Sequence, residues 1–216
     1  MEETKRRRFI IRAVLEGEVD VQDAPQPTRV PIYEWDFTDS LIDKKQSQEA
    51  KISNSVVMTE NGLSFTSGTC CCLLGDNVFA PGHTLEIDIA SMEYNLSGHG
   101  RLVMFNDTAT PLVTSNVGNG FILRNVSPPA WAFYKGAWSS SFSTDKELFS
   151  GKTLVMKYYQ DGTDYKTDVY CDSTLIASYS SGPWNLTANQ SVQIGSGGNA
   201  YKNMVISGVR IYEGVE

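Results

Sequence analysis

Short runs of alternating apolar and polar residues, separated by clusters of Gly, Asn, Asp and Ser, fill most of this 216-residue chain. In residues 84–90, three apolar side chains share one face and two acidic side chains share the other, as in a half-buried strand. No stretch carries capped apolar residues at helical spacing. Many short strands of this kind predict an all-β, antiparallel two-sheet jelly-roll sandwich. The other expected strands are residues 101–105, 120–126, 130–134, 153–159, 167–171 and 175–179.

Two short turns predict hairpins in the second half of the chain. Asp161-Gly162 follows Tyr158-Tyr159, and Asp-Gly is a strong turn sequence. Asp172-Ser173-Thr174 separates two apolar stretches, residues 169–171 and 175–177. Each turn is therefore expected to join two antiparallel strands.

Two motifs near opposite ends of the chain are more specific. Residues 34–43 read EWDFTDSLID, and residues 192–195 read VQIG, followed after a Gly/Asn loop by VISGVRIY at residues 205–212. They resemble the W-x-F-x-x-S-L-x-D opening strand and the I-G…I-x-x-V-R-I-Y closing strand of the laminin G-like branch of the concanavalin A-like lectin/glucanase superfamily. The turn at Asp172 likewise resembles the V-Y-x-D-G-x-L-I hairpin of that family, with Ser in place of Gly.

The resemblance covers about residues 33–214 and implies that the first and last strands lie side by side. Trp35 and Phe37 should then point inwards from the opening strand, and Val209 and Ile211 from the closing strand. Apolar side chains, and not a disulfide, are expected to close the sandwich.

Residues 1–31 differ in composition from residues 32–216, which we assign to the sandwich domain. The first segment has a basic run, a strand-like apolar stretch, an acidic stretch and a Pro-rich linker. It has too little apolar mass to fold alone. We expect an extended arm that docks on other protein chains of a larger assembly, through Arg7, Arg8, Phe9, Ile10, Ile11, Val14 and Leu15. Contact of the basic run with nucleic acid is the alternative.

Charge and hydropathy limit the other partners. The net charge of −7 disfavours binding to nucleic acid or to an anionic membrane. No run approaches the roughly 18 apolar residues of a membrane helix, and no secretory signal peptide is visible at the N-terminus. We therefore expect a protein made in a cytoplasm, with no nucleic-acid or membrane partner.

The four cysteines predict a protein with reduced thiols. Cys70, Cys71 and Cys72 are adjacent and Cys171 is alone, and this spacing does not suit a zinc site. Small buried hydrophobic residues are the expected role. A disulfide between Cys171 and one of the other three stays open.

A hydrolase-like pattern lies in residues 86–93, EIDIASME. Family 16 glycoside hydrolases share the superfamily and carry E-x-D-x-E or E-x-D-x-x-E on one strand face. Glu86 and Asp88 match the first two positions, but Ala90 and Ser91 occupy the two alternative third positions. Glu93 lies an odd number of residues from Glu86, so without a bulge it points to the opposite face.

We also expect the chain to turn soon after Glu93, and Glu86 and Asp88 to be polar residues on a solvated face. No G-x-S-x-G elbow or phosphate-cradling glycine loop is present. The sequence therefore predicts no catalytic residues and no enzyme activity.

Aromatic residues around position 131 suggest a sugar site. Trp131 and Phe133 share one strand face and are expected in the core. Exposed aromatic rings can stack on sugars while neighbouring polar groups bind hydroxyls. The candidate carbohydrate-binding residues are Trp138, Tyr134, Arg124 and Asn125.

No cofactor is expected, although calcium is common in this superfamily. Asp107, Asp161 and Asp164 lie in short acidic turns and are weak calcium candidates. Such turns are more often plain turns.

Three functions remain for such a chain. The leading hypothesis is a non-enzymatic structural and binding module of a bacteriophage virion, for capsid decoration, head fibre or tail, anchored by residues 1–31 and displaying a lectin-like domain for glycans. The alternatives are a free carbohydrate-binding lectin and a family 16-like glycan hydrolase. Fold alone cannot separate the three.

Overall fold

The computed structural model describes residues 29–53, 55–66, 70–94, 100–106, 119–124, 130–135, 137–143, 148–180, 190–196 and 201–215. These residues form strands and connecting turns without a helix. The chain divides after Val30, and all of these strands lie in the unit Pro31–Glu216. The strands are β1 (Tyr33–Asp36), β2 (Lys51–Ile52), β3 (Val56–Thr59), β4 (Gly62–Phe65), β5 (Cys72–Phe79), β6 (His83–Tyr94), β7 (Gly100–Asn106), β8 (Asn119–Arg124), β9 (Ala130–Lys135), β10 (Ala137–Ser143), β11 (Lys152–Asp161), β12 (Asp164–Cys171), β13 (Thr174–Ser180), β14 (Gln190–Ser196) and β15 (Tyr201–Glu213).

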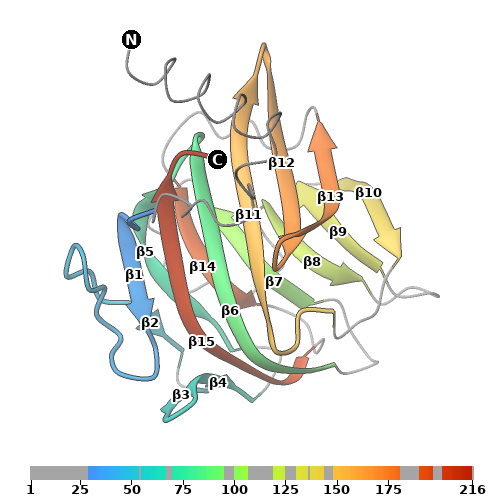
Figure 1. Cartoon of the computed structure of the whole chain (residues 1–216). Coiled ribbons are helices and arrows are strands. Elements are labelled where there is room, and N and C mark those ends of the chain that lie inside the picture. The colour runs from blue at the N-terminus through green and yellow to red at the C-terminus, as the bar shows by residue number, and fades with distance from the viewer. Residues whose placement is uncertain are drawn as a thin grey trace, which may run out of the picture. The chain divides into compact units, whose positions relative to one another are not determined.

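The strands build two antiparallel sheets. Sheet I has the order β13-β12-β11-β6-β15-β4-β3, and β1 also pairs with β15. Sheet II has the order β10-β9-β8-β7-β14-β5-β2. Figure 1 shows β15, β6 and β11 of sheet I in front of β14, β7 and β8 of sheet II. The predicted all-β, two-sheet jelly-roll sandwich is confirmed.

Apolar side chains from the two sheets fill the core. Among the largest are Phe121, Trp131, Phe133 and Phe149, each at most 2% exposed. The Phe121 ring stacks on Trp131 with centroids 5.0 Å apart, and Phe149 meets Trp131 edge-on at the same distance. Aromatic packing of this kind contributes beyond the area buried. The predicted core positions of Trp131 and Phe133 are confirmed.

The opening and closing strands are neighbours, as the terminal motifs predicted. Trp35 of β1 lies opposite Val209 of β15, and Tyr33 lies opposite Ile211. Trp35, Val209 and Ile211 are each at most 1% exposed, and so is Phe37 just beyond β1. Apolar packing therefore closes the sandwich where its two terminal strands meet.

The last residue of the opening motif protects the free edge of β1. Asp43 is 1% exposed, and its carboxylate accepts the backbone N–H groups of Glu34 and Gln46. The backbone N–H of Lys44 donates to the carbonyl of Glu34 at 2.8 Å. This loop thus satisfies polar groups that an edge strand would otherwise expose.

Both predicted hairpins are present. Gly162, with φ +65°, lies in the turn from β11 to β12, where Asp161 pairs with Asp164. The turn from β12 to β13 places Asp172 at φ +53°, a left-handed conformation that Asp tolerates better than most residues. These turns bring β11, β12 and β13 together at one edge of sheet I.

All four cysteines are buried free thiols. Cys171 therefore forms no disulfide with Cys70, Cys71 or Cys72 in the structure. Burial raises the pKa values of the Cys71, Cys72 and Cys171 thiols. A buried thiol with a raised pKa is a poor nucleophile, so these residues act as small core side chains.

Replacing Trp35 tests the closure. Trp35→Ala should lower the free energy of unfolding by about 3–5 kcal/mol, because it removes a fully buried aromatic side chain between β1 and β15. Val57→Ala is the matched control: Val57 is 54% exposed on β3, and its truncation should cost below about 0.5 kcal/mol. Thermal and urea melts measure both. A Trp35→Ala protein that melts like the wild type would show that the closing contact is peripheral.

Candidate functional site

One arginine of β15 holds two carboxylates of β6. Arg210 lies opposite Glu86 in the register of these strands. Its Nε donates to Glu86 Oε2 at 3.1 Å, and its Nη2 donates to Asp88 Oδ1 at 2.9 Å. Its Nη1 lies 2.8 Å from Asp88 Oδ2, so the guanidinium binds both oxygens of that carboxylate.

Two hydroxyl groups complete the cluster, which we call the Arg210 clamp: Glu86, Asp88, Thr153, Arg210 and Tyr212. Tyr212 Oη donates to Glu86 Oε2 at 3.1 Å, and Thr153 Oγ1 donates to Asp88 Oδ1 at 2.8 Å. Tyr212 belongs to β15 and Thr153 to β11. The clamp therefore ties β11, β6 and β15 together on the outward face of sheet I.

The clamp shifts the pKa values of its proton donors. Burial disfavours the charge on Arg210, but the bonds and negative charges of Asp88 and Glu86 outweigh this, and the pKa of the guanidinium is raised. Burial and the charge of Glu86 raise the pKa of the Tyr212 hydroxyl. At neutral pH Arg210 is thus a cation and Tyr212 a neutral donor.

This geometry corrects the expectation that Glu86 and Asp88 are plain solvated residues. They do lie on the outward face, but their side chains are only 23% and 27% exposed and both bind Arg210. Sequence reasoning missed Arg210 and Tyr212 as their partners. The signal was present in the closing motif, in which Arg210 and Tyr212 alternate with the inward-facing Val209 and Ile211.

Strand β6 also continues beyond the predicted turn, to Tyr94. Its ladder with β15 pairs Ile89 and Ser91 with consecutive residues of β15 and skips Ala90. An extra residue of this kind is a β-bulge, which interrupts the alternation of side chains along a strand.

The bulge decides the direction of Glu93. Ala90 and Ser91 are both exposed, Met92 is 3% exposed in the core, and Glu93 is exposed again. Glu93 therefore lies on the same outward face as Asp88. The opposite face was predicted for Glu93 only in a strand without a bulge, and the bulge at Ala90 brings Glu93 back to the outward face.

Glu93 nevertheless does not complete a hydrolase pair with Asp88. Five residues of strand at about 3.3 Å each put the two Cα atoms roughly 16 Å apart, whereas paired glycosidase carboxyls are about 5–9.5 Å apart. Glu93 Oε2 instead accepts a hydrogen bond from Asn203 at 2.9 Å. Ala90 and Ser91 occupy the outward positions nearer to Asp88, and neither residue carries a carboxyl group.

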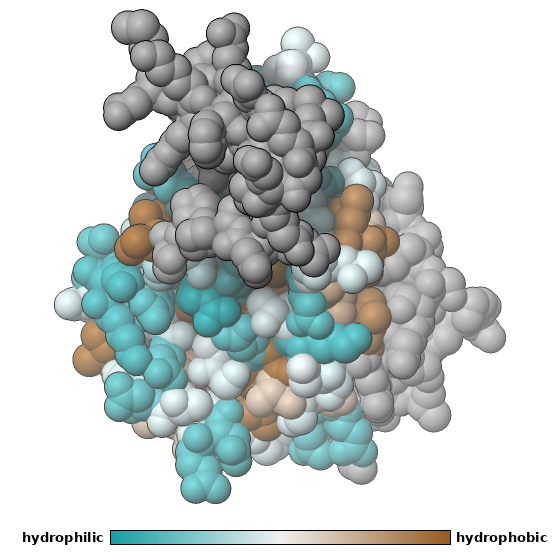
Figure 2. Space-filling model, in the orientation of Figure 1, coloured by the Kyte–Doolittle hydropathy of each residue, from teal (hydrophilic) through white to brown (hydrophobic). Residues whose placement is uncertain are grey.

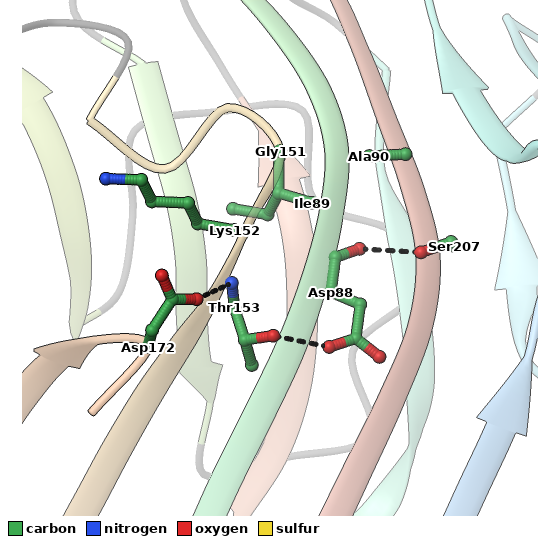
Figure 3. Close-up of a pocket in the computed structure, with 8 residues that line it drawn as sticks. All are labelled: Asp88, Ile89, Ala90, Gly151, Lys152, Thr153, Asp172 and Ser207. Atoms are coloured by element: carbon green, nitrogen blue, oxygen red, sulfur yellow. Dashed lines mark hydrogen bonds between the residues drawn. The ribbon is translucent and has the colours of Figure 1, made fainter.

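A hollow of about 220 Å³ opens beside the clamp. Figure 3 shows Thr153 between two carboxylates: its backbone N–H donates to Asp172 Oδ1 at 3.0 Å, and its hydroxyl donates to Asp88. Ser207 Oγ donates to the backbone oxygen of Asp88 at 3.3 Å. Sequence reasoning did not identify this hollow, which is lined by Asp88, Ile89, Ala90, Gly151, Lys152, Thr153, Asp172 and Ser207.

Two irregularities explain the hollow. The β6–β15 ladder skips Ala90 on one strand and Ser207 on the other, so two small residues lie where the sheet bends. Gly151, with φ +70°, lies just before β11 and has no side chain to fill the space. Hydroxyls and carboxylates remain at the wall, and both can bind the hydroxyl groups of a ligand.

The predicted sugar-binding residues lie on sheet II. The register puts Trp138 of β10 opposite Tyr134 of β9, so the backbone brings these two positions together. Arg124 pairs with Ala130, at the other end of the β8–β9 ladder. Asn125 and the side chains of the other three fall outside the described residues, and the sugar site there stays a prediction.

The remaining predicted sites are only partly described. The docking residues Arg7, Arg8, Phe9, Ile10, Ile11, Val14 and Leu15 fall outside the described ranges, as does the calcium candidate Asp107. Asp161 forms an ion pair with Lys166 beside Asp164. Within the described residues, no group of three or more His, Cys, Asp or Glu side chains could hold a metal ion. The same residues include no helix long and apolar enough to span a membrane.

No family model and no curated protein sequence matches the chain, but solved structures do. A legume lectin-like domain from Entamoeba histolytica matches with a TM-score of 0.52 at 13% identity, covering 76% of this chain and 89% of that one. Domain 4 of AbnA, a GH43 extracellular arabinanase from Geobacillus stearothermophilus, solved with arabinotriose, gives 0.56 at 14% identity, covering 86% and 93%. The chain has a concanavalin A-like lectin/glucanase fold. An endo-1,3-beta-glucanase from Streptomyces sioyaensis gives 0.54 at 12% identity, covering 87% and 97%.

Removal of Arg210 tests the clamp. Arg210→Ala should lower the free energy of unfolding by about 1–3 kcal/mol, because two partly buried carboxylates lose their shared cation. Lys44→Ala is the control. Lys44 is the exposed ion-pair partner of Asp36, a β1 residue of the same sheet, and its removal should cost much less stability than Arg210→Ala. Chemical melts at neutral pH compare the two. Equal stability of both variants would mean that the clamp contributes no more than a surface ion pair.

Proposed function

We propose that residues 32–216 form a carbohydrate-binding module without hydrolase activity. The Arg210 clamp is the observation that carries this proposal. It uses the two carboxylates of the hydrolase-like pattern to join strands, while the third position of that pattern carries no carboxyl group. The concanavalin A-like fold supports the carbohydrate part by analogy, since lectin-like domains and glucanases share it.

The chemistry of glycoside hydrolysis supports the same choice. A hydrolase needs one carboxyl group to protonate the leaving oxygen and a second to attack or to activate water. Glu86 and Asp88 direct their oxygens at Arg210, Tyr212 and Thr153. A ligand approaching the outward face meets a bonded network and an adjacent hollow, which is an arrangement for binding.

A paired assay tests this function. Wild-type protein should bind at least one oligosaccharide on a glycan microarray and release no reducing sugar from β-glucan or galactan. Glu86→Gln, checked for folding by a thermal melt, should leave both results unchanged. Release of reducing sugar that Glu86→Gln abolishes would establish the hydrolase alternative, and absence of glycan binding would remove the proposed function.

We further infer that this module belongs to a larger assembly, with a bacteriophage particle as the candidate. The composition of residues 1–31 supports it: an apolar stretch after a basic run, joined to the domain by a Pro-rich linker. An extended segment of this kind gains stability by adding to a partner chain. A free lectin would have no use for it.

Deletion of residues 1–30 tests the assembly role. The strands described lie after Val30, so the truncated domain should keep its β-sheet circular dichroism and cooperative melting. The truncated domain should no longer sediment with purified bacteriophage particles. Incorporation equal to that of the full chain would refute the docking role of residues 1–31 without affecting glycan binding.

A further inference from the structure

Outward-facing side chains continue from the hollow along β11 and β12. They alternate with core residues such as Leu154, Met156 and Val169, which are at most 1% exposed. Because side chains two residues apart share a strand face, these residues form one continuous strip. The strip consists of Thr153, Val155, Lys157 and Tyr159 on β11, and Lys166, Asp168 and Tyr170 on β12, with Asp172 just beyond.

An apolar platform lies on this strip next to the hollow. Tyr170 pairs with Val155 on one side and with Leu175 of β13 on the other. Leu175 is 52% exposed. The Nζ atom of Lys157 lies 4.9 Å from the centroid of the Tyr170 ring, which helps to fix the ring on the sheet. Figure 2 shows this face as mixed polar and hydrophobic, with hydrophobic residues towards β12 and β13.

We propose that this outward face of sheet I binds a neutral oligosaccharide, with one sugar ring in the hollow and the next ring on the Tyr170 platform. The proposal rests on the carbohydrate-binding function and places its site. It selects sheet I over the Trp138 and Tyr134 positions of sheet II.

The hollow supplies the hydroxyl-binding half of the site. Its volume of about 220 Å³ accommodates a single sugar ring. Asp172 Oδ1 accepts a hydrogen bond from the Thr153 backbone N–H. The Asp172 carboxylate retains lone pairs that can accept hydrogen bonds from sugar hydroxyls. The Ser207 hydroxyl gives its hydrogen to the Asp88 backbone oxygen and keeps lone pairs that accept a sugar hydroxyl. Ala90 and Gly151 leave room for close approach of the ring.

The platform supplies the apolar half. Val155 lies two residues along β11 from Thr153, which lines the hollow, and Tyr170 pairs with Val155 on the neighbouring strand. This spacing is about 6.6 Å, comparable to the advance of one sugar residue along an oligosaccharide. The C–H face of a sugar ring stacked there buries apolar surface of Tyr170, Val155 and Leu175.

Charge disfavours an acidic ligand, because the cations of the strip and the clamp are already engaged. Lys166 pairs with Asp161, Arg210 binds Glu86 and Asp88, and Lys157 lies over the Tyr170 ring. A neutral glycan needs no such cation.

The test begins with a glycan microarray and continues with isothermal titration of arabinotriose, laminaripentaose and the best neutral oligosaccharide of the array. Ala90→Trp, which fills the hollow, should weaken binding at least tenfold. Tyr170→Ala should do the same by removing the platform. Asp172→Asn should weaken binding several-fold, and it keeps the turn because Asn also tolerates positive φ.

Matched variants separate loss of the site from loss of the fold. Tyr170→Phe keeps the ring and should bind within twofold of the wild type. Val57→Trp introduces the same side chain as Ala90→Trp at an exposed position of β3 in the same sheet, and it should bind normally. Trp138→Ala tests the sheet II position and should also bind within twofold. Thermal melts confirm that each variant is folded.

Each contrary result has a distinct meaning. If the wild type binds glycans and Ala90→Trp and Tyr170→Ala bind equally well, the site on sheet I is refuted and the carbohydrate-binding function stands. Loss of binding in Trp138→Ala with Ala90→Trp unaffected moves the site to sheet II. Binding of sulfated or uronic-acid glycans alone refutes the neutral class. A wild type that binds no glycan refutes both the function and the site.

Discussion

The pairing of β15 with its neighbours holds the sandwich together and also builds its outward face. β15 pairs with β6 along one side and with β1 and β4 along the other. Its inward residues Val209 and Ile211 enter the core beside Trp35, while its outward residues Arg210 and Tyr212 bind the carboxylates of β6. One strand therefore closes the domain and aligns the polar groups that a ligand would meet.

Irregularities in that same ladder give the outward face its shape. A regular sheet presents a flat surface, whereas the skipped residues Ala90 and Ser207 bend the ladder and leave small side chains at the bend. The hollow lies at this place, next to the turn residue Asp172. β-bulges often lie near functional sites because they re-aim side chains without changing the fold.

The clamp shows how a fold shared with hydrolases can accommodate acidic residues in another role. Two carboxylates on one strand face would repel each other, and Arg210 offsets that repulsion while joining β6 to β15. The energy of the pair then stabilises the register of the sheet. A rigid, hydrogen-bonded face of this kind is well suited to binding a ligand of fixed shape, because little ordering accompanies association.

The sequence by itself determined strands such as β7, β9 and β11, the hairpin turns at Gly162 and Asp172, and the inward positions of Trp35 and Val209, because these depend on alternation and turn chemistry within a few residues. It also placed Glu86 and Asp88 on one outward face. The tertiary structure alone decided that Arg210 binds them, that Glu93 shares their face, and that a hollow opens at Ala90. These features arise from the register between strands whose paired residues lie 124 positions apart and from bulges in that register. The local pattern of residues along one strand specifies neither the register with a distant strand nor the bulges in it.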